Sequence, residues 1–146
     1  MDNLLLIKQS LLTMLSGLFV FLFGVWDGAF QVLVTFIVLD YITGVMDGYV
    51  MKNLNSKDSF RGIVKKIATL ITVAIAVLVD RAIGVDCLRM ATILCLIGNE
   101  GISIVENLGE LGVPIPKKII NALVQLKTFG DEEEENKGDD NHGNVK

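Results

Sequence analysis

Residues 29–51 read AFQVLVTFIVLDYITGVMDGYVM and form an almost continuous apolar stretch. A helix needs ~20 such residues to cross the hydrocarbon core of a bilayer, so this stretch predicts a transmembrane helix. The whole chain has the same character, because 51% of its 146 residues are hydrophobic and its mean hydropathy is +0.54. Ordinary soluble domains reach about 45 to 50% apolar residues only when glycine is counted as well. The sequence therefore predicts an all-α integral membrane protein.

Three further apolar segments accompany this one, at residues 11–26, 63–79 and 88–105. The last two are close to the ~17 residues that a span requires at minimum, and the first is short unless Ser10 and its neighbours join it. The first segment ends in FGVWD (23–27), which lacks the small residues of a signal-peptide cleavage site, so we expect it to be retained. We predict four transmembrane helices, and a three-span arrangement with residues 11–26 at the membrane interface stays open.

Basic residues are distributed unevenly between the connections. The turn Trp26-Asp27-Gly28 contains no lysine or arginine, whereas the connection after residue 51 and the start of the next segment are basic. By the positive-inside rule this basic connection and both termini are cytoplasmic. The residues that determine this topology are Lys52, Lys57, Arg61, Lys65 and Lys66.

The chain changes character after Pro114 and Pro116, because proline lacks a backbone donor and opposes continuation of a helix. Residues 117–127 predict a short amphipathic helix with lysines beside an apolar face. That face could lie on an anionic membrane surface or pack against the protein's own loop, and both alternatives stay open. Residues 130–146 are acidic and poor in apolar residues, which predicts a disordered tail after a transmembrane domain of residues 1–129.

Ionisable residues within the apolar segments are informative, because each costs ~2.5 to 3.5 kcal/mol at the bilayer centre unless it finds a partner or water. One stripe of the 29–51 helix, spaced i, i+4, i+7 and i+8, consists of Asp40, Gly44, Asp47 and Gly48. A second stripe, in and after the 88–105 segment, consists of Glu100, Ser103, Glu106 and Asn107. We hypothesise that these stripes form contacts between subunits or line an aqueous lesion. Packing against other helices of the same chain is the alternative.

Two expectations concern charge partners. Glu106 should lie near the cytoplasmic end of its helix, where Lys65 or Lys66 begins the antiparallel neighbour, so an ion pair is predicted there. Glu100, about 9 Å deeper at ~1.5 Å per residue, is expected to be out of reach of these lysines. Solvation in a loop is favoured over a mutual charge cluster for Asp80, Arg81, Asp86 and Arg89.

Catalytic groups are not evident in the sequence. Asp40 and Asp47 are separated by ~10 Å along one helix, so within one chain they cannot share a proton as an aspartic protease dyad does. The single histidine, His142, lies in the polar tail, and Cys87 and Cys95 are expected to pack among apolar side chains. We therefore expect no enzymatic activity, no cofactor and no metal site.

The order of polar elements within these segments resembles that of phage lysis holins and of related holins linked to the export of large clostridial toxins. The matching elements, from roughly residue 38 to 126, are LDYITG (39–44), NSKDSFRG (55–62) leading to Lys65 and Lys66, Asp80, Asn99 with Glu100, Ser103, Glu106 with Asn107, and GVPIP (112–116). The strongly acidic end departs from the basic or mixed tail of many holins.

The resemblance implies a non-enzymatic protein that associates with itself in the bacterial cytoplasmic membrane. Such a protein opens lesions through which an endolysin or a toxin passes, and no nucleic acid partner is expected. We hypothesise that association through Asp40, Gly44 and Gly48 precedes opening, and that Glu100 and Glu106 become wetted in the assembled state. The competing hypothesis is a small transport or scaffold subunit that needs a dedicated partner and opens no large hole.

Overall fold

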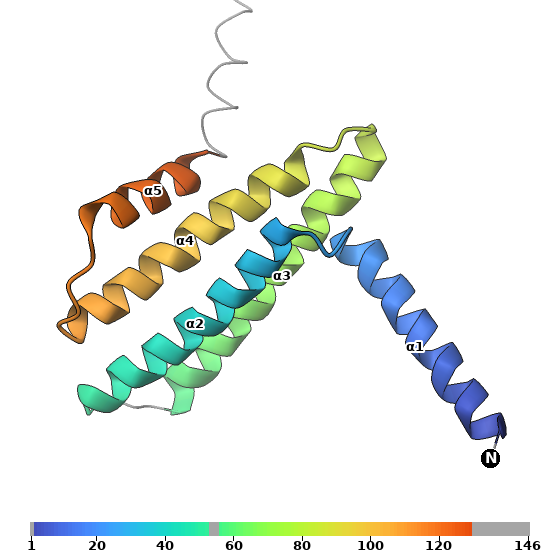
Figure 1. The fold of residues 1–146 in the computed structure, drawn as a ribbon, viewed down its shortest axis with the longest axis horizontal. Helices are drawn as coiled ribbons and strands as arrows, with labels where there is room; N and C mark the ends of the chain where they lie inside the picture. The colour runs from blue at the N-terminus through green and yellow to red at the C-terminus, as the bar shows by residue number, and fades with distance from the viewer. Residues whose placement is uncertain (1, 53–55, 130–146) are drawn as a thin grey trace, which may run out of the picture.

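The computed structural model describes residues 2–52 and 56–129, and all regular structure in these ranges is helical (Figure 1). Four of the helices, α1 to α4, are long and apolar enough to cross a membrane, which confirms the predicted all-α membrane fold. The acidic segment 130–146 lies outside the described residues. The helices are α1 (Asp2–Phe23), α2 (Gly28–Val50), α3 (Ser56–Ile83), α4 (Leu88–Glu110) and α5 (Lys117–Thr128).

Three of the helices extend beyond their apolar segments. α1 begins at Asp2 instead of residue 11, and its apolar part, Leu4–Phe23, has the 20 residues that a span requires. α3 begins at Ser56 instead of residue 63, and α4 continues to Glu110 instead of ending at residue 105. The differences arise because hydropathy marks only the stretch suited to hydrocarbon. The backbone hydrogen bonds of a helix continue through the polar residues on either side.

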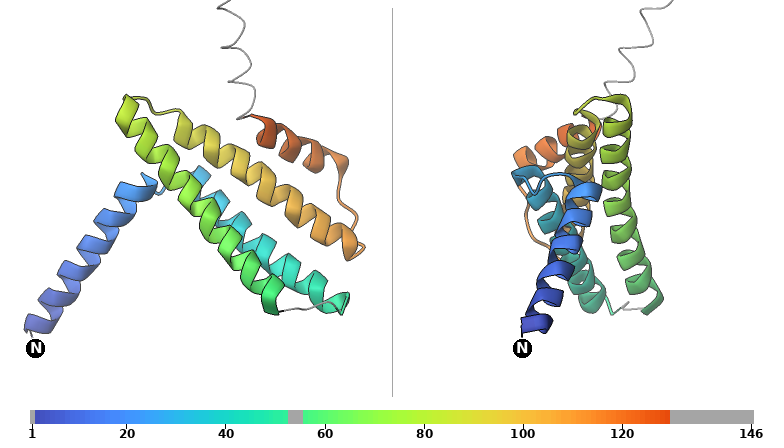
Figure 2. Two further views of the ribbon diagram at one scale, coloured as in Figure 1. Left: turned by 180° about the vertical axis from the view of Figure 1, so that it is seen from behind. Right: turned by 90° about the vertical axis from the view of Figure 1, so that its right-hand side faces the viewer.

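Helices α2, α3 and α4 form a bundle in which α4 is central, since α2, α3 and α5 all pack against it. Figures 1 and 2 show α3 running opposite to α2 and α4 running in the direction of α2. The buried apolar core lies in the half of the bundle nearest the start of α2, and the opposite half contains buried polar side chains. The core consists of Phe30, Leu33, Ile37, Val73, Ile93 and Ile97.

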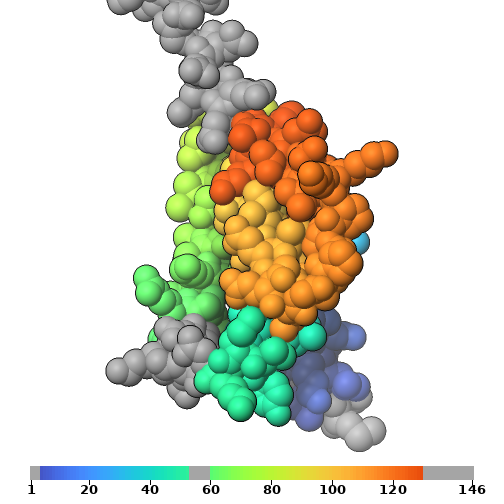
Figure 3. Space-filling model, turned by 90° about the vertical axis from the view of Figure 1, so that its left-hand side faces the viewer, coloured from blue at the N-terminus to red at the C-terminus, as the bar shows by residue number. Residues whose placement is uncertain are grey.

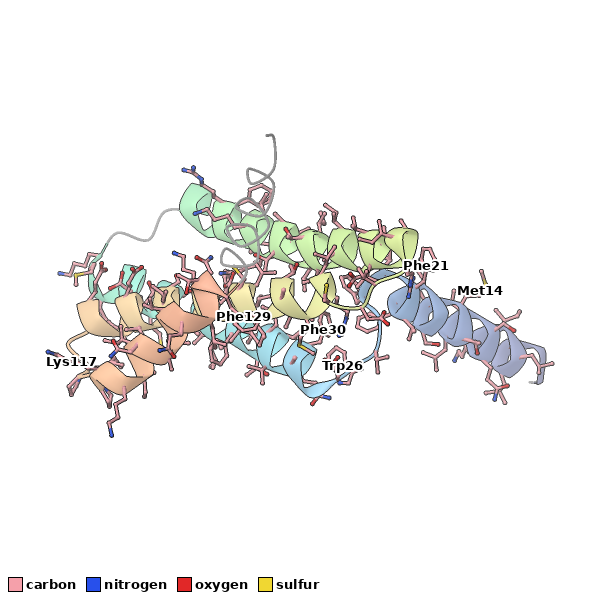
Figure 4. The ribbon with its side chains drawn as sticks, turned by 90° about the horizontal axis from the view of Figure 1, so that it is seen from above. Met14, Phe21, Trp26, Phe30, Lys117 and Phe129 are labelled. Carbon is pink, nitrogen blue, oxygen red and sulfur yellow. The ribbon has the colours of Figure 1, made fainter. Side chains whose placement is uncertain are left out.

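Helix α1 diverges from the bundle over most of its length (Figures 1 and 2). None of its apolar window is buried, and the side chain of Met14 stands clear of the bundle in Figure 4. Its contacts lie near its end, where the rings of Phe19 and Phe23 lie 5.9 and 5.5 Å from that of Phe30 in α2, and where α3 also touches it. Helix α1 is therefore an arm that is joined to the bundle at one end.

Helix α5 folds back along α4 and covers part of it (Figure 3). Two glycines of α4 permit this approach, because a Cβ on Gly98 would lie 2.4 Å from the backbone nitrogen of Lys127. A Cβ on Gly101 would lie 2.4 Å from Cδ2 of Leu123, which is buried. The apolar face of α5, expected on a membrane surface or against a loop, thus packs on α4 through the small residues that close helix contacts require.

Candidate functional site

Three charged residues from three helices meet at one level of the bundle. Asp40 lies ten residues before the end of α2, Lys66 ten residues after the start of α3, and Glu100 ten residues before the end of α4. At ~1.5 Å per residue this level is ~15 Å from the helix ends, about half the thickness of the hydrocarbon core. The Nζ atom of Lys66 forms ion pairs with Oδ2 of Asp40 and Oε2 of Glu100.

Lys66 pairs with Glu100, whereas an ion pair of the α3 lysines with Glu106 was predicted. That prediction was wrong because it began α3 near residue 63, whereas the helix begins at Ser56. The additional turns place Lys66 level with Glu100. Glu106 is exposed and has no ion pair within the described ranges.

The remaining carboxylate oxygens of this network also accept hydrogen bonds. Asn107 donates to Oδ1 of Asp40 at 3.3 Å and to Oγ1 of Thr43 at 3.0 Å, and Thr69 donates to Oε1 of Glu100 at 3.3 Å. The side chains of Asp40 and Glu100 are only 9% and 5% exposed, against 18% for Lys66. Two buried carboxylates therefore share one ammonium, and their remaining acceptors are satisfied by neutral donors.

Sequence reasoning missed Thr43 and Thr69 as members of this network. Nothing in the sequence distinguishes them from threonines that bond their own helix. Thr43 also donates to the carbonyl oxygen of Asp40 in α2, and the hydroxyl of Thr69 lies 3.1 Å from the carbonyl oxygen of Lys65 in α3. The spacing of Thr43 three residues after Asp40 placed the two on one face, but their shared contact with Asn107 depends on how α4 packs.

A cavity of about 640 Å³ adjoins the charge network between α2, α3 and α4. The glycine stripe of α2 opens into it, since a Cβ on Gly44 would meet only Nδ2 of Asn107, at 3.5 Å. Gly44 therefore makes no close helix contact within the described chain. Gly98 and Gly101 of α4, in contrast, lie directly against α5. Six of the eight predicted site residues line the cavity: Asp40, Gly44, Gly48, Glu100, Ser103 and Asn107.

The other two predicted site residues lie outside the lining. Glu106 is exposed, and Asp47 lies about two turns of α2 beyond Asp40, toward the α2–α3 connection. Oδ1 of Asp47 is buried and accepts no hydrogen bond from the residues that the structure describes. The carboxyl of Glu110 in α4 interacts with Asp47, so this end of the bundle contains an acidic pair with an unfilled acceptor.

The predicted topology residues fall into two groups. Lys52 and Arg61 are exposed at the α2–α3 connection, whereas Lys65 and Lys66 line the cavity. The side chain of Lys57 lies outside the described part of the chain.

The opposite end of the bundle is held by arginines. Arg89 forms an ion pair with Asp27, with Nη1 and Oδ2 2.6 Å apart, and donates to the carbonyls of Phe23 and Val25 at 2.8 and 2.7 Å. Gly24 is required between α1 and α2, because its φ is +75° and a Cβ there would lie 2.9 Å from Nε of Arg89. The guanidinium thus satisfies carbonyls at the end of α1 and fixes the turn.

Two more of the charges expected to be solvated are also bound. Arg81 donates to the carbonyls of Val20 and Phe21 near the end of α1. Asp80 is buried and accepts from the backbone nitrogens of Leu88 at 3.1 Å and Arg89 at 2.8 Å, so it caps α4. The expectation of solvated loop charges was wrong for Asp80 and Arg89, because the open ends of α1 and α4 need polar partners, whereas Arg81 is exposed.

We predict that the stability of the Asp27–Arg89 ion pair depends on pH. The hydrogen bond from Arg89 lowers the pKa of Asp27 from its ordinary value of 3.8, although partial desolvation opposes this shift. A lowered pKa means that the pair stabilises the turn above the ordinary pKa and is lost as pH falls through the lowered one. In ¹³C NMR titrations of the carboxyl in micelles, Arg89→Gln should return the pKa toward 3.8. Arg81→Gln is the matched control, and equal titration curves for both variants would contradict the assignment.

Comparison with known proteins gives one family. Residues 17–128 match the sequence model of the bacteriophage holin family. An uncharacterized 14.9 kDa protein of Clostridium perfringens is 41% identical over 128 residues, which cover 86% of this chain and 97% of the relative. A probable holin of Bacillus phage phi105 is 35% identical over 99 residues, covering 67% of this chain and 73% of that protein. No solved structure matches the chain significantly.

Proposed function

Because this chain belongs to the bacteriophage holin family, which is not an enzyme family, we propose that it opens lesions in the cytoplasmic membrane of a bacterium and thereby releases an endolysin. It would accumulate as a multi-span protein and associate with further copies of itself before opening. With the basic α2–α3 connection inside, both termini are proposed to be cytoplasmic.

The observation that carries this proposal is the polar cavity within the membrane-spanning bundle. Six of the eight polar and small residues singled out in the sequence line a space that no side chain of the described chain fills. In lipid, polar surface of this kind needs protein or water beside it. Association of several copies would place protein beside this surface, and a wetted lesion would place water beside it.

The test is inducible expression in a bacterium, with membrane potential, viability and release of a cytoplasmic reporter enzyme followed together. A delayed, sudden depolarisation with enzyme release supports lesions large enough for an endolysin. Depolarisation without enzyme release contradicts endolysin passage. Stable potential and continued growth at high membrane abundance would instead identify a partner-dependent transport or scaffold subunit, and export only of a co-expressed toxin would identify a toxin as the cargo.

A single glycine substitution tests the self-association step. Gly44→Leu should abolish chemically crosslinked oligomers while membrane insertion is retained, because the new side chain enters the cavity of about 640 Å³ instead of the packed core. Gly109→Leu is the matched control, since a Cβ at Gly109 meets nothing within 4 Å. Oligomers of normal size in Gly44→Leu would rule out the cavity as the association site.

A further inference from the structure

We propose that the α1 arm of one copy docks at the cavity of a neighbouring copy, with Lys8 of the arm meeting Asp47 of the neighbour. The inference rests on the self-association proposed above and names the two surfaces that make it. Three observations on the described residues support it: Lys8 of α1 forms no ion pair, glycines of α2 line the cavity, and Oδ1 of Asp47 is buried without a hydrogen-bond donor.

Charge is the first argument for α1 as the occupant. Lys8 is the one charged residue of the span Leu4–Phe23, and it forms no ion pair with any residue that the structure describes. Asp47 lacks a positive partner, because its buried Oδ1 accepts no hydrogen bond from the described residues and the charged group beside it, Glu110, is also an acid. A lysine in the apolar segment and a buried acid without a positive partner each cost free energy until they meet an opposite charge.

Distance along the helix axes from the turn between α1 and α2 is the second argument. α1 ends at Phe23 and α2 begins at Gly28, so distances along both helices can be counted from this shared turn. Lys8 lies fifteen residues before Phe23 and Gly44 sixteen residues after Gly28, which places them ~22 and ~24 Å from the turn. Asp47 is ~28 Å from it, nearer the proposed cytoplasmic surface, toward which a membrane lysine extends its side chain.

The face of α1 that contains Lys8 also suits an opening rimmed by glycine. Leu5 and Leu12, three residues before and four residues after Lys8, share its face and are exposed. Leu5 lies ~27 Å from the turn, close to the ~30 Å of Gly48. A leucine over a glycine is the large-against-small contact that lets membrane helices approach closely.

Geometry favours a neighbour's arm over the chain's own. α1 is attached through Arg81 of α3, whose guanidinium lies 4.9 Å from the centre of the Phe21 ring. Thr72, on the same helix, lines the cavity. The nine residues from Thr72 to Arg81 turn a helix by about 180°, so the arm and the cavity lie on opposite sides of α3. Each copy therefore offers its arm on one side and receives an arm on the other, which is a head-to-tail contact.

Disulfide crosslinking between two tagged copies tests the contact. In full-length chains carrying Cys87→Ser and Cys95→Ser, one copy receives Leu5→Cys and a differently tagged copy receives Gly48→Cys. Oxidation in membranes should join the two tags. Ile7→Cys is the matched control, since Ile7 is exposed at nearly the same depth on the opposite face of α1, and it should crosslink at least tenfold less.

Two results would overturn the proposal. One is equal crosslinking from Leu5→Cys and Ile7→Cys, which shows that the arm has no preferred face toward Gly48. The other is a disulfide that forms within one chain when both Leu5→Cys and Gly48→Cys are placed in it, without any joining of separate tags. That result would show an arm that returns to its own cavity.

Charge reversal tests the ion pair independently. Lys8→Glu and Asp47→Lys should each lower the Leu5–Gly48 crosslink at least tenfold, because each brings like charges together. The double variant, with both reversals on every chain, should recover most of the yield. No recovery in the double variant, with both proteins inserted normally, would remove Lys8 and Asp47 as a pair.

The outcomes separate this inference from the proposed function. Enzyme release without a Leu5–Gly48 crosslink would leave the lesion-forming function standing and overturn the arm contact. A crosslink without depolarisation or enzyme release would establish the arm contact and contradict the function.

Discussion

Lys66→Met is expected to destabilise the bundle by about 3 to 5 kcal/mol, the cost of removing one partner from a buried ion pair. The ammonium of Lys66 is the counter-charge for both Asp40 and Glu100, whose side chains are almost fully buried. Without it, Glu100 keeps a hydrogen bond from Thr69 and Asp40 keeps one from Asn107. Neither donor contributes a positive charge. The helix content retained during titration with a denaturing detergent measures the loss.

Two variants make this prediction specific. Lys65→Met removes a neighbouring exposed lysine and should leave the detergent midpoint nearly unchanged. Adding Asp40→Asn and Glu100→Gln to Lys66→Met neutralises the whole network and should recover most of the stability, since a fully neutral site no longer contains an uncompensated charge. Equal midpoints for the Lys66 and Lys65 variants would show that the network adds no stability.

Gly98→Ala is expected to displace α5 from α4. The added Cβ would lie 2.4 Å from the backbone nitrogen of Lys127 and 2.7 Å from the carbonyl oxygen of Leu123, and backbone atoms cannot rotate aside. Overpacking of this kind costs about 1 to 3 kcal/mol, and 1.4 kcal/mol corresponds to about a tenfold change in the fraction of released α5.

The thiol of Cys95 reports this release, because its Sγ lies 3.1 Å from the carbonyl oxygen of Lys127. In a Cys87→Ser background, Gly98→Ala should raise the alkylation rate of Cys95 by roughly tenfold. Gly109→Ala is the control, as its Cβ would meet nothing within 4 Å. Unchanged alkylation in Gly98→Ala would mean that α5 tolerates the methyl group without moving.

The sequence was sufficient to predict the apolar helices and to select eight site residues, six of which line the cavity, because both follow from local spacing. Apolar length predicts a span, and the i, i+4, i+8 spacing places Asp40, Gly44 and Gly48 on one face whatever lies opposite. Which partner a face meets depends on helix register. α3 begins seven residues before its apolar segment. This shift in register makes Glu100 the partner of Lys66 in place of the predicted Glu106.

Other features could not be predicted from composition. The Gly98-x-x-Gly101 pair was visible as two small residues in α4, but only the direction of the chain after Pro116 shows that α5 returns onto it. Arg89 reads as a loop charge in the sequence. Its partners, Asp27 and the carbonyls at the end of α1, lie more than sixty residues earlier, and such distant pairings leave no local pattern.

The opposite placement of arm and cavity on α3 has a thermodynamic consequence for an assembly built in this way. In an open row every added copy forms one arm contact, so the free energy gained per copy is constant and rows lengthen gradually with concentration. One arm and one cavity stay unfilled at the two ends of the row. Joining those ends forms an additional contact within a single particle, at a high effective concentration, and costs no further copy. Closure would therefore set a preferred size and give an abrupt transition that row growth alone does not provide.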